Sequence, residues 1–295
     1  MKTGLIFASG AALLCVAVLA EDDVPPVQGG RTYVQYQVEM AKARHPEIQS
    51  IVVSGLRDKT KDNVILGSTL GAAAVFRKVP PDPVKDAPIK DTAGPSKDGS
   101  QYIVREAFLS NTDHRLGTTE IRFARKPGQD TNRLLAIAKS VQSEMRRATL
   151  SAKNAIDPYP YDAAFTDNTY AQALTEKLTL AHPELLVMMI HATPPGKTTN
   201  VVIGSNIGRL GKLADEDDLR VIDKGSTNLE LGADGDRFET ELPLNDASGK
   251  RIGALGLVFA FRAGQDKEAI HAQGRAIRDE LAKQIPNNAA LFAPR

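Results

Sequence analysis

Five polar residues in the second half of the sequence have side chains that could bind a small molecule: Ser205, Asn206, Arg209, His191 and Glu241. Arginine offers a forked pair of donors that suits a carboxylate, and small polar side chains can orient a bound molecule. His191 ends an apolar run typical of a strand, so its ring could point into a pocket. This set predicts a site for a small anionic or zwitterionic ligand. For Ser205 and Asn206 the alternative is a turn that closes a hairpin.

Signatures of the common enzymes and metal sites are missing from the sequence. It contains no Gly-x-Ser-x-Gly elbow, no phosphate-binding Gly-x-x-x-x-Gly-Lys-Ser/Thr loop and no His-Glu-x-x-His motif. The five histidines are not spaced as metal ligands, and the acidic run 215–218 lacks the pattern of a calcium loop. That run fits the start of a helix, which favours carboxylates. We therefore expect no catalytic residue, metal or cofactor, while an enzyme with a dispersed site stays an alternative.

The N-terminal residues indicate export. Residues 1–20 contain Lys2, an uncharged run to Leu19 and a small residue before the acidic Glu21, which is the layout of a cleavable signal peptide. The alternative is an uncleaved anchor, for which the apolar run is short. The only cysteine, Cys15, lies inside this segment, so the exported chain would contain no disulfide. We expect a soluble periplasmic or secreted protein with no membrane span after cleavage.

The charge balance restricts the partners. The chain has 37 Lys and Arg against 36 Asp and Glu, a formal net charge of +1. Nucleic acid and anionic membrane surfaces favour a strongly basic face. Neither is therefore expected as the main partner.

An internal repeat organises the rest of the chain. His45-Pro46-Glu47 matches His182-Pro183-Glu184 at an offset of 137 positions (182 − 45), and no insertion is needed across this block. Gly128-Gln129-Asp130 matches Gly264-Gln265-Asp266 at an offset of 136 (264 − 128). Two blocks in the same order predict a duplication. We place the units at 32–148 and 169–285, joined by a linker at 149–168.

Each copy has the pattern helix, hairpin, variable stretch, hairpin, helix. In the second copy His182-Pro183 ends the first helix, and the apolar runs 185–190 and 200–203 flank turn residues. A second strand pair covers 238–244 and 251–261, before a closing helix. The paired strands are too close in sequence for helical crossovers, so the sheet must be antiparallel. This predicts an α+β fold.

These residues resemble a known family. His182-Pro183-Glu184, Val201 to Asn206 and Asp246 to Gly253 are similar to segments of the extracytoplasmic PAS-like sensor units called Cache or PDC domains, which often occur in tandem. The resemblance implies two tandem PAS-like units, each a five-stranded antiparallel sheet flanked by an N-terminal and a C-terminal helix. It also implies a pocket between the sheet and the variable loops, for amino acids, carboxylates or other small metabolites. Family members usually belong to transmembrane receptors, so a signal from this chain would need a separate envelope protein.

The expected function is small-molecule binding or sensing. The alternative is a protein-interaction or assembly factor of the cell envelope, built on the same fold without its cavity. Residues 76–99 of the first copy contain five prolines, which forbid a regular helix there. We therefore expect the two copies to differ in ligand or in binding competence.

Overall fold

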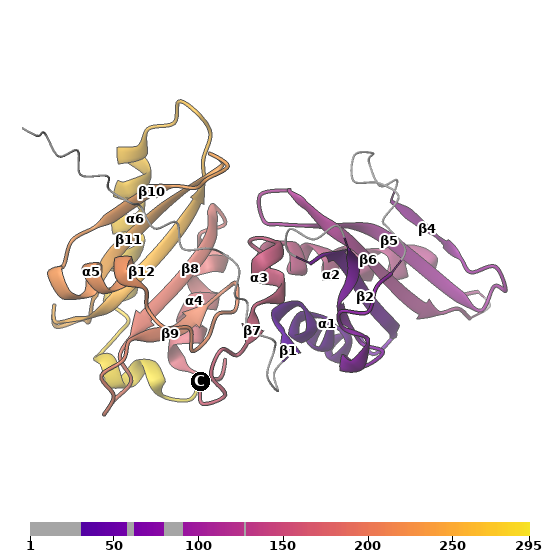
Figure 1. Ribbon diagram of the computed structural model, residues 1–295, viewed down its shortest axis with the longest axis horizontal. Helices are drawn as coiled ribbons and strands as arrows, with labels where there is room; N and C mark the ends of the chain where they lie inside the picture. Colours follow the sequence, from indigo (N-terminus) through magenta and orange to yellow (C-terminus); the bar gives the residue numbers. More distant parts are fainter. Residues whose placement is uncertain (1–30, 58–61, 80–90, 127) are drawn as a thin grey trace, which may run out of the picture.

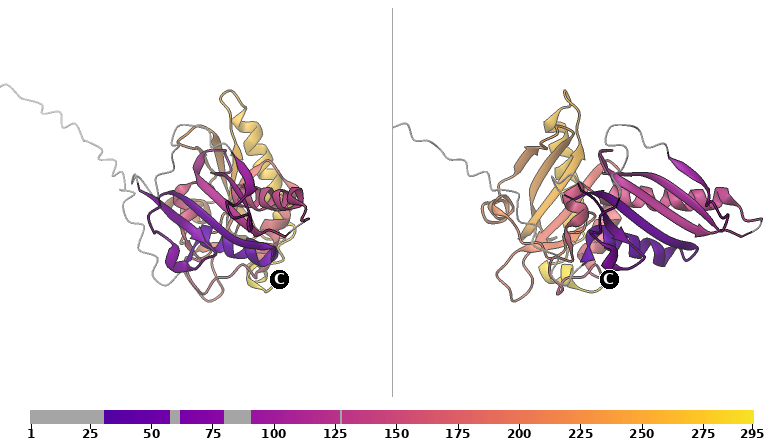
Figure 2. Two further views of the ribbon diagram at one scale, coloured as in Figure 1. Left: turned by 90° about the vertical axis from the view of Figure 1, so that its right-hand side faces the viewer. Right: turned by 45° about the vertical axis from the view of Figure 1, so that its right-hand side comes forward.

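The computed structural model describes residues 31–57, 62–79, 91–126 and 128–295, and the predicted signal segment 1–20 lies outside these ranges. The described chain forms two five-stranded antiparallel sheets with helices, which confirms the α+β prediction. The sheets lie in two lobes side by side, as seen in Figure 1 and in the right-hand view of Figure 2. No helix within the described ranges is long and apolar enough to cross a membrane.

The first sheet has the strand order β3-β2-β6-β5-β4. Helix α1 packs on β2 and β3, and helix α2 packs on β5 and β6. Their buried apolar residues form one core between the helices and a single face of the sheet. The elements are α1 (Tyr33–Arg44), β2 (Ile48–Leu56), β3 (Asn63–Ser68), the short 3-10 helix η1 (Ala72–Ala74), β4 (Thr92–Pro95), β5 (Gln101–Leu109), β6 (Arg115–Ala124) and α2 (Thr131–Ala148).

The second sheet has the order β9-β8-β12-β11-β10. Helices α4 and α6 cover one face of it, and the helix α5 contacts β11 and β12. The elements are α4 (Tyr170–Ala181), β8 (Leu185–Ala192), β9 (Val201–Ser205), α5 (Glu216–Lys224), β10 (Asn228–Leu231), β11 (Arg237–Asn245), β12 (Arg251–Ala260), α6 (Lys267–Ala282) and the 3-10 helix η2 (Asn288–Phe292).

The two sheets match in order and in register. Across the first sheet the cross-strand partners run Ser68, Val52, Glu120, Arg105 and Thr92. In the second sheet the corresponding row is Ser205, Met189, Gly256, Glu241 and Asn228. Each residue of one row is 136 or 137 positions from its counterpart, the same offsets as in the sequence repeat. The strands β4 and β10, which the residue pattern did not reveal, complete the two sheets; the unit limits 32–148 and 169–285 stay predictions.

Local sequence explains where the helices begin and end. Thr32 and Thr169 cap the N-termini of α1 and α4, and His45 and His182 end these helices through their backbone N–H groups. The ring of His182 contacts the carboxylates of Glu184 and Glu280. The acidic run 215–218 starts α5 with a reciprocal capping box between Asp215 and Asp218.

The linker region has more structure than its sequence pattern suggested. It contains helix α3 (Ala152–Ile156) and strand β7 (Pro158–Tyr159), and β7 pairs with β1 (Arg31–Thr32). Asn154 donates to the carbonyl of Ile207 at 2.8 Å, and Tyr36 stacks on Tyr159 with ring centroids 4.2 Å apart. These contacts place the linker between the two lobes, where prolines and short elements left no periodic signal.

Candidate functional site

The two faces of the second sheet differ in chemistry. Side chains alternate along a strand, so β11 directs Thr240 to one face and Glu239 and Glu241 to the other. Thr240 lies against Gly274 of α6, which identifies its face as the apolar core side. His191 shares the opposite face with Glu241, as the strand register shows. This face lies beneath α5 and contains buried polar side chains.

Asp218 of α5 joins these residues into a cluster. Its Oδ2 lies 3.5 Å from His191 Nδ1, and its carboxyl shares a hydrogen bond with that of Glu241. Exposed fractions are 3% for His191, 8% for Asp218 and 5% for Glu241. The capping box fixes Asp218, because its Oδ2 also accepts from the backbone N–H of Asp215 at 2.8 Å. Three elements, β8, β11 and α5, therefore position one closed polar cluster.

Several atoms of this cluster have no hydrogen-bond partner. Neither ring nitrogen of His191 makes a hydrogen bond, and the contact of Nδ1 with Asp218 Oδ2 is long at 3.5 Å. Glu241 Oε1 is also buried without a partner. An unsatisfied buried polar group costs about 1–3 kcal/mol. A bound molecule with matching polar groups would remove that cost.

The burial of the cluster shifts its pKa values. Burial lowers the pKa of His191, which Asp218 opposes, so the ring is held neutral. Burial raises the pKa of Glu241, and so does the hydrogen bond with Asp218. Burial also raises the pKa of Glu239 to about 7, with Glu230 and Asp218 adding like charge. For Asp218 burial acts upward, but the hydrogen bond from Glu241 and the nearby His191 outweigh it and lower the pKa. The pair Asp218 and Glu241 thus shares one proton at neutral pH.

Gly256 of β12 lies in the middle of this face, between Glu241 on β11 and Met189 on β8. A Cβ atom added there would have Met189 Cε at 3.7 Å and Glu239 Oε1 at 3.8 Å, which are ordinary contact distances. At Gly253, by contrast, a Cβ would fall 1.8 Å from the His191 carbonyl oxygen. Close packing therefore requires glycine at 253 and not at 256. Gly256 therefore leaves the middle of the polar face without a side chain of its own, with Met189 and Glu239 on either side.

The sequence-predicted residues fall into two groups. His191 and Glu241 lie in the cluster, both in contact with Asp218. Ser205 Oγ instead accepts from the backbone N–H of Ile207 at 3.2 Å, as expected for a turn that closes a hairpin.

Asn206 and Arg209 also bond within the protein. Asn206 Oδ1 accepts from Met188 N at 2.9 Å, and its Nδ2 donates to the carbonyl of Leu186 at 3.1 Å. Arg209 Nε lies 3.3 Å from Asp157 Oδ2, so its guanidinium has a carboxylate partner in the linker.

Two residues of the cluster were absent from the sequence prediction. Asp218 was interpreted only as part of a helix start, a role that it does have. Glu239 and Glu241 alternate with Phe238, Thr240 and Leu242 along β11. Acidic residues at alternate positions of an otherwise buried strand were the available signal.

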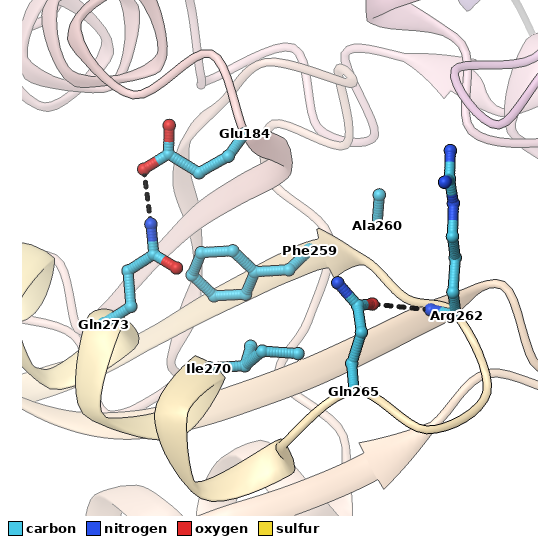
Figure 3. Close-up of a pocket in the computed structure, with 7 residues that line it drawn as sticks. All are labelled: Glu184, Phe259, Ala260, Arg262, Gln265, Ile270 and Gln273. Atoms are coloured by element: carbon cyan, nitrogen blue, oxygen red, sulfur yellow. Dashed lines mark hydrogen bonds between the residues drawn. The ribbon is translucent and has the colours of Figure 1, made fainter.

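A separate hollow of about 330 Å³ lies beside the start of α6 (Figure 3). Its polar side chains already have partners within the protein: Gln273 donates to the Glu184 side chain at 2.7 Å, and Gln265 Oε1 accepts from the backbone N–H of Arg262 at 2.6 Å. The corresponding residue of the first copy, Gln129, accepts from its own turn in the same way. This repetition indicates a structural turn, so the site is assigned to the polar face beneath α5. Within the described ranges, no three His, Cys, Asp or Glu residues are arranged to hold a metal ion.

No protein-family model matches the chain, and no curated protein sequence matches it. Among solved structures it is similar to the GAF domain of A. aeolicus nlh2 in an inactive state, with 14% identity over 40% of this chain and 85% of that chain at a TM-score of 0.31. It is also similar to a putative GAF sensor protein from Burkholderia vietnamiensis, with 16% identity, coverage of 41% and 76%, and a TM-score of 0.31.

A third similar structure is the inducer-binding domain of the PobR transcription factor from Acinetobacter in complex with 3-hydroxybenzoic acid. It is 12% identical, covers 86% of this chain and 95% of that chain, and has a TM-score of 0.17. Because these TM-scores lie below 0.5, we derive the function from the residues of the site.

Proposed function

We propose that this chain is an exported, sensor-like protein that binds a small molecule on its second sheet, beneath α5. The observation that supports this most is the set of unpartnered buried atoms: both ring nitrogens of His191 and Oε1 of Glu241. They lie beside Gly256, where the sheet lacks a side chain. Sites of this kind combine a few fixed polar groups with an apolar surround.

The first copy has a charged side chain at the position of Gly256. Glu120 takes the place of Gly256, and its carboxylate pairs with Arg105 at 2.5 Å and Arg122 at 2.6 Å. The two arginines neutralise Glu120, whereas the corresponding row of the second copy has Gly256 and Glu241. Binding therefore belongs to the second unit, and the tandem Cache-like arrangement with units 32–148 and 169–285 is part of the proposal.

Export and partner choice follow from the sequence. Residues 1–20 direct export to the periplasm or the medium, and a separate envelope protein receives any signal. Expression in a bacterial host with intact-mass measurement of the exported protein tests this. A mass beginning at Glu21 supports cleavage, and a mass beginning at Met1 supports an anchor.

A thermal-shift screen of the exported protein tests binding. Amino acids, organic acids, amines and purines form the panel, since a compound bound only by the folded state raises the melting temperature. A genuine hit disappears in Gly256→Leu, which places a large side chain on this face between Met189 and Glu239, and persists in Arg105→Ala, which changes the corresponding row of the first copy. A panel without hits, or hits that ignore Gly256→Leu, would contradict the site and favour the alternative, an interaction or assembly factor.

Catalysis is the second candidate, because an ionised Asp218 beside a protonated Glu241 is also an acid–base arrangement. Hydrolysis assays on chromogenic esters, phosphates and glycosides address it. Turnover by the wild type that is lost in Glu241→Gln would establish an enzyme. Binding without turnover supports the sensor-like function.

A further inference from the structure

The two copies differ in how the carboxylates of the polar face are neutralised. In the first copy Arg105 and Arg122 lie on either side of Glu120, at 2.5 and 2.6 Å. The residue that corresponds to Arg105 in the second copy is Glu241, which occupies the same position in the strand register. An arginine has thus been replaced by a carboxyl at the centre of the row.

The second copy offers no internal substitute for that arginine. Among the described residues, no Lys or Arg forms an ion pair with Glu239 or Glu241. Lys212 and Arg209 act on the cluster only through longer-range electrostatics, and the guanidinium of Arg209 is paired with Asp157.

Arg237, on the same side of β11 as Glu239 and Glu241, is paired with Asp234 and Asp236. The groups that raise the pKa values of Glu239 and Glu241 are acidic and come from α5 and its cap, from β11 and from β10: Asp218, Asp215, Glu239, Glu241 and Glu230. An anion placed there would meet carboxyls on several sides, whereas a cation would supply the missing charge.

From this difference we propose that the ligand of the second unit carries a cationic nitrogen group, an ammonium or guanidinium, bound between Glu239, Glu241 and Asp218. The proposal rests on the proposed function and specifies its ligand class. The cationic group takes the role that Arg105 has in the first copy. The neutral ring of His191, buried and unpartnered, accepts a hydrogen bond from the ligand at one nitrogen and donates at the other. The ammonium end of a zwitterion satisfies the same site.

An organic cation fits better than a metal ion. No three ligating side chains within the described ranges are arranged to hold a metal, although His191, Asp218 and Glu241 are close. Carboxyls and an imidazole on three different elements can instead surround an extended group with several N–H donors. Thermal-shift assays with zinc, added alone and after EDTA treatment, distinguish a metal ion from an organic cation as the bound positive charge.

Binding of a cation has a consequence for protons. At neutral pH Glu241 is protonated and Glu239, with a pKa of about 7, is partly protonated. A bound cation favours their ionised forms, so binding releases protons and tightens as the pH rises. An anion would take up protons and bind more weakly at higher pH.

The test uses four probes of similar length: putrescine, γ-aminobutyrate, butanediol and succinate. Each is added in excess to the exported full-length protein in thermal-shift assays. Any probe that binds is titrated calorimetrically in two buffers of different ionisation enthalpy. We expect putrescine or γ-aminobutyrate to raise the melting temperature with release of about one proton, and butanediol and succinate to have no effect.

Variants of the polar face test whether the amine binds there. Glu241→Gln and Glu239→Gln keep the shape of the protonated side chains, so both variants are expected to fold. Each should weaken the binding of the amine at least about tenfold, the usual worth of a charge-assisted hydrogen bond. Glu216→Gln removes an exposed carboxylate of α5 and should leave affinity unchanged.

The outcomes separate the two proposals. Stabilisation by succinate, with proton uptake and loss in Gly256→Leu, would overturn the cationic class and leave the binding site in place. Stabilisation by zinc that EDTA reverses, without any effect of the amines, would overturn the organic cation. No effect from any probe or from the broader screen would overturn both proposals.

Discussion

Glu239 provides a direct test of the electrostatics of the polar face. Burial and the neighbouring carboxyls raise its pKa from 4.5 to about 7. A carboxyl with a raised folded-state pKa contributes stability that is present below the unfolded value and lost as the pH rises through the folded value. At about 1.4 kcal/mol per pKa unit, this shift amounts to about 3 kcal/mol. The variant Glu239→Gln has no such loss, so its free energy of unfolding should gain about 3 kcal/mol on the wild type between about pH 4.5 and pH 8.

Urea unfolding followed by circular dichroism at several pH values measures this difference. Glu216→Gln is the matched control, because it removes an exposed carboxylate from the first turn of α5. Its difference from the wild type should stay small at every pH, within about 0.5 kcal/mol. A difference between Glu239→Gln and the wild type that does not change with pH would refute the raised pKa of Glu239 in this face.

Three further predictions concern packing and local structure. Gly253→Ala should lower the free energy of unfolding by at least about 3 kcal/mol, because its Cβ would lie 1.8 Å from the His191 carbonyl oxygen. Gly256→Ala should keep the free energy of unfolding within about 1 kcal/mol of the wild-type value. Urea unfolding measures both. Asp215→Ala removes the N-cap of α5 and should lower the free energy of unfolding by about 1 kcal/mol in the same assay. Arg209→Ala removes the ion-pair partner of the buried Asp157 and should lower the free energy of unfolding by about 3 kcal/mol, but it should not abolish the thermal shift of a ligand bound beneath α5.

The fold was predictable because its signals are local and repeated. His45 and His182 each precede a proline, so the ends of two helices could be placed from sequence. Strand pairs joined by short turns required an antiparallel sheet. The short edge strands β4 and β10 were not visible in this way, because four mostly exposed residues give no alternating pattern.

The site was only partly predictable, because its members meet through register and helix packing. His191 and Glu241 could be selected as polar residues in apolar strands. Asp218 gave the signal of a helix cap, and nothing in the local sequence shows that its other oxygen faces His191. Arg209 looked like an anion-binding residue, yet its partner Asp157 lies in the linker, 52 positions earlier. A contact of this kind, between the linker and the second unit, leaves no trace in local sequence patterns.

The ring of His191 offers the most direct measurement of a ligand site beneath α5. Nitrogen-15 NMR of the histidine rings, with His191 assigned from the variant His191→Gln, reports the protonation and hydrogen bonding of each ring nitrogen. The account predicts a neutral ring at neutral pH whose nitrogen resonances move when putrescine or another thermal-shift hit is added. If a compound that stabilises the protein left both His191 resonances unchanged while signals elsewhere moved, the site would lie in another part of the molecule.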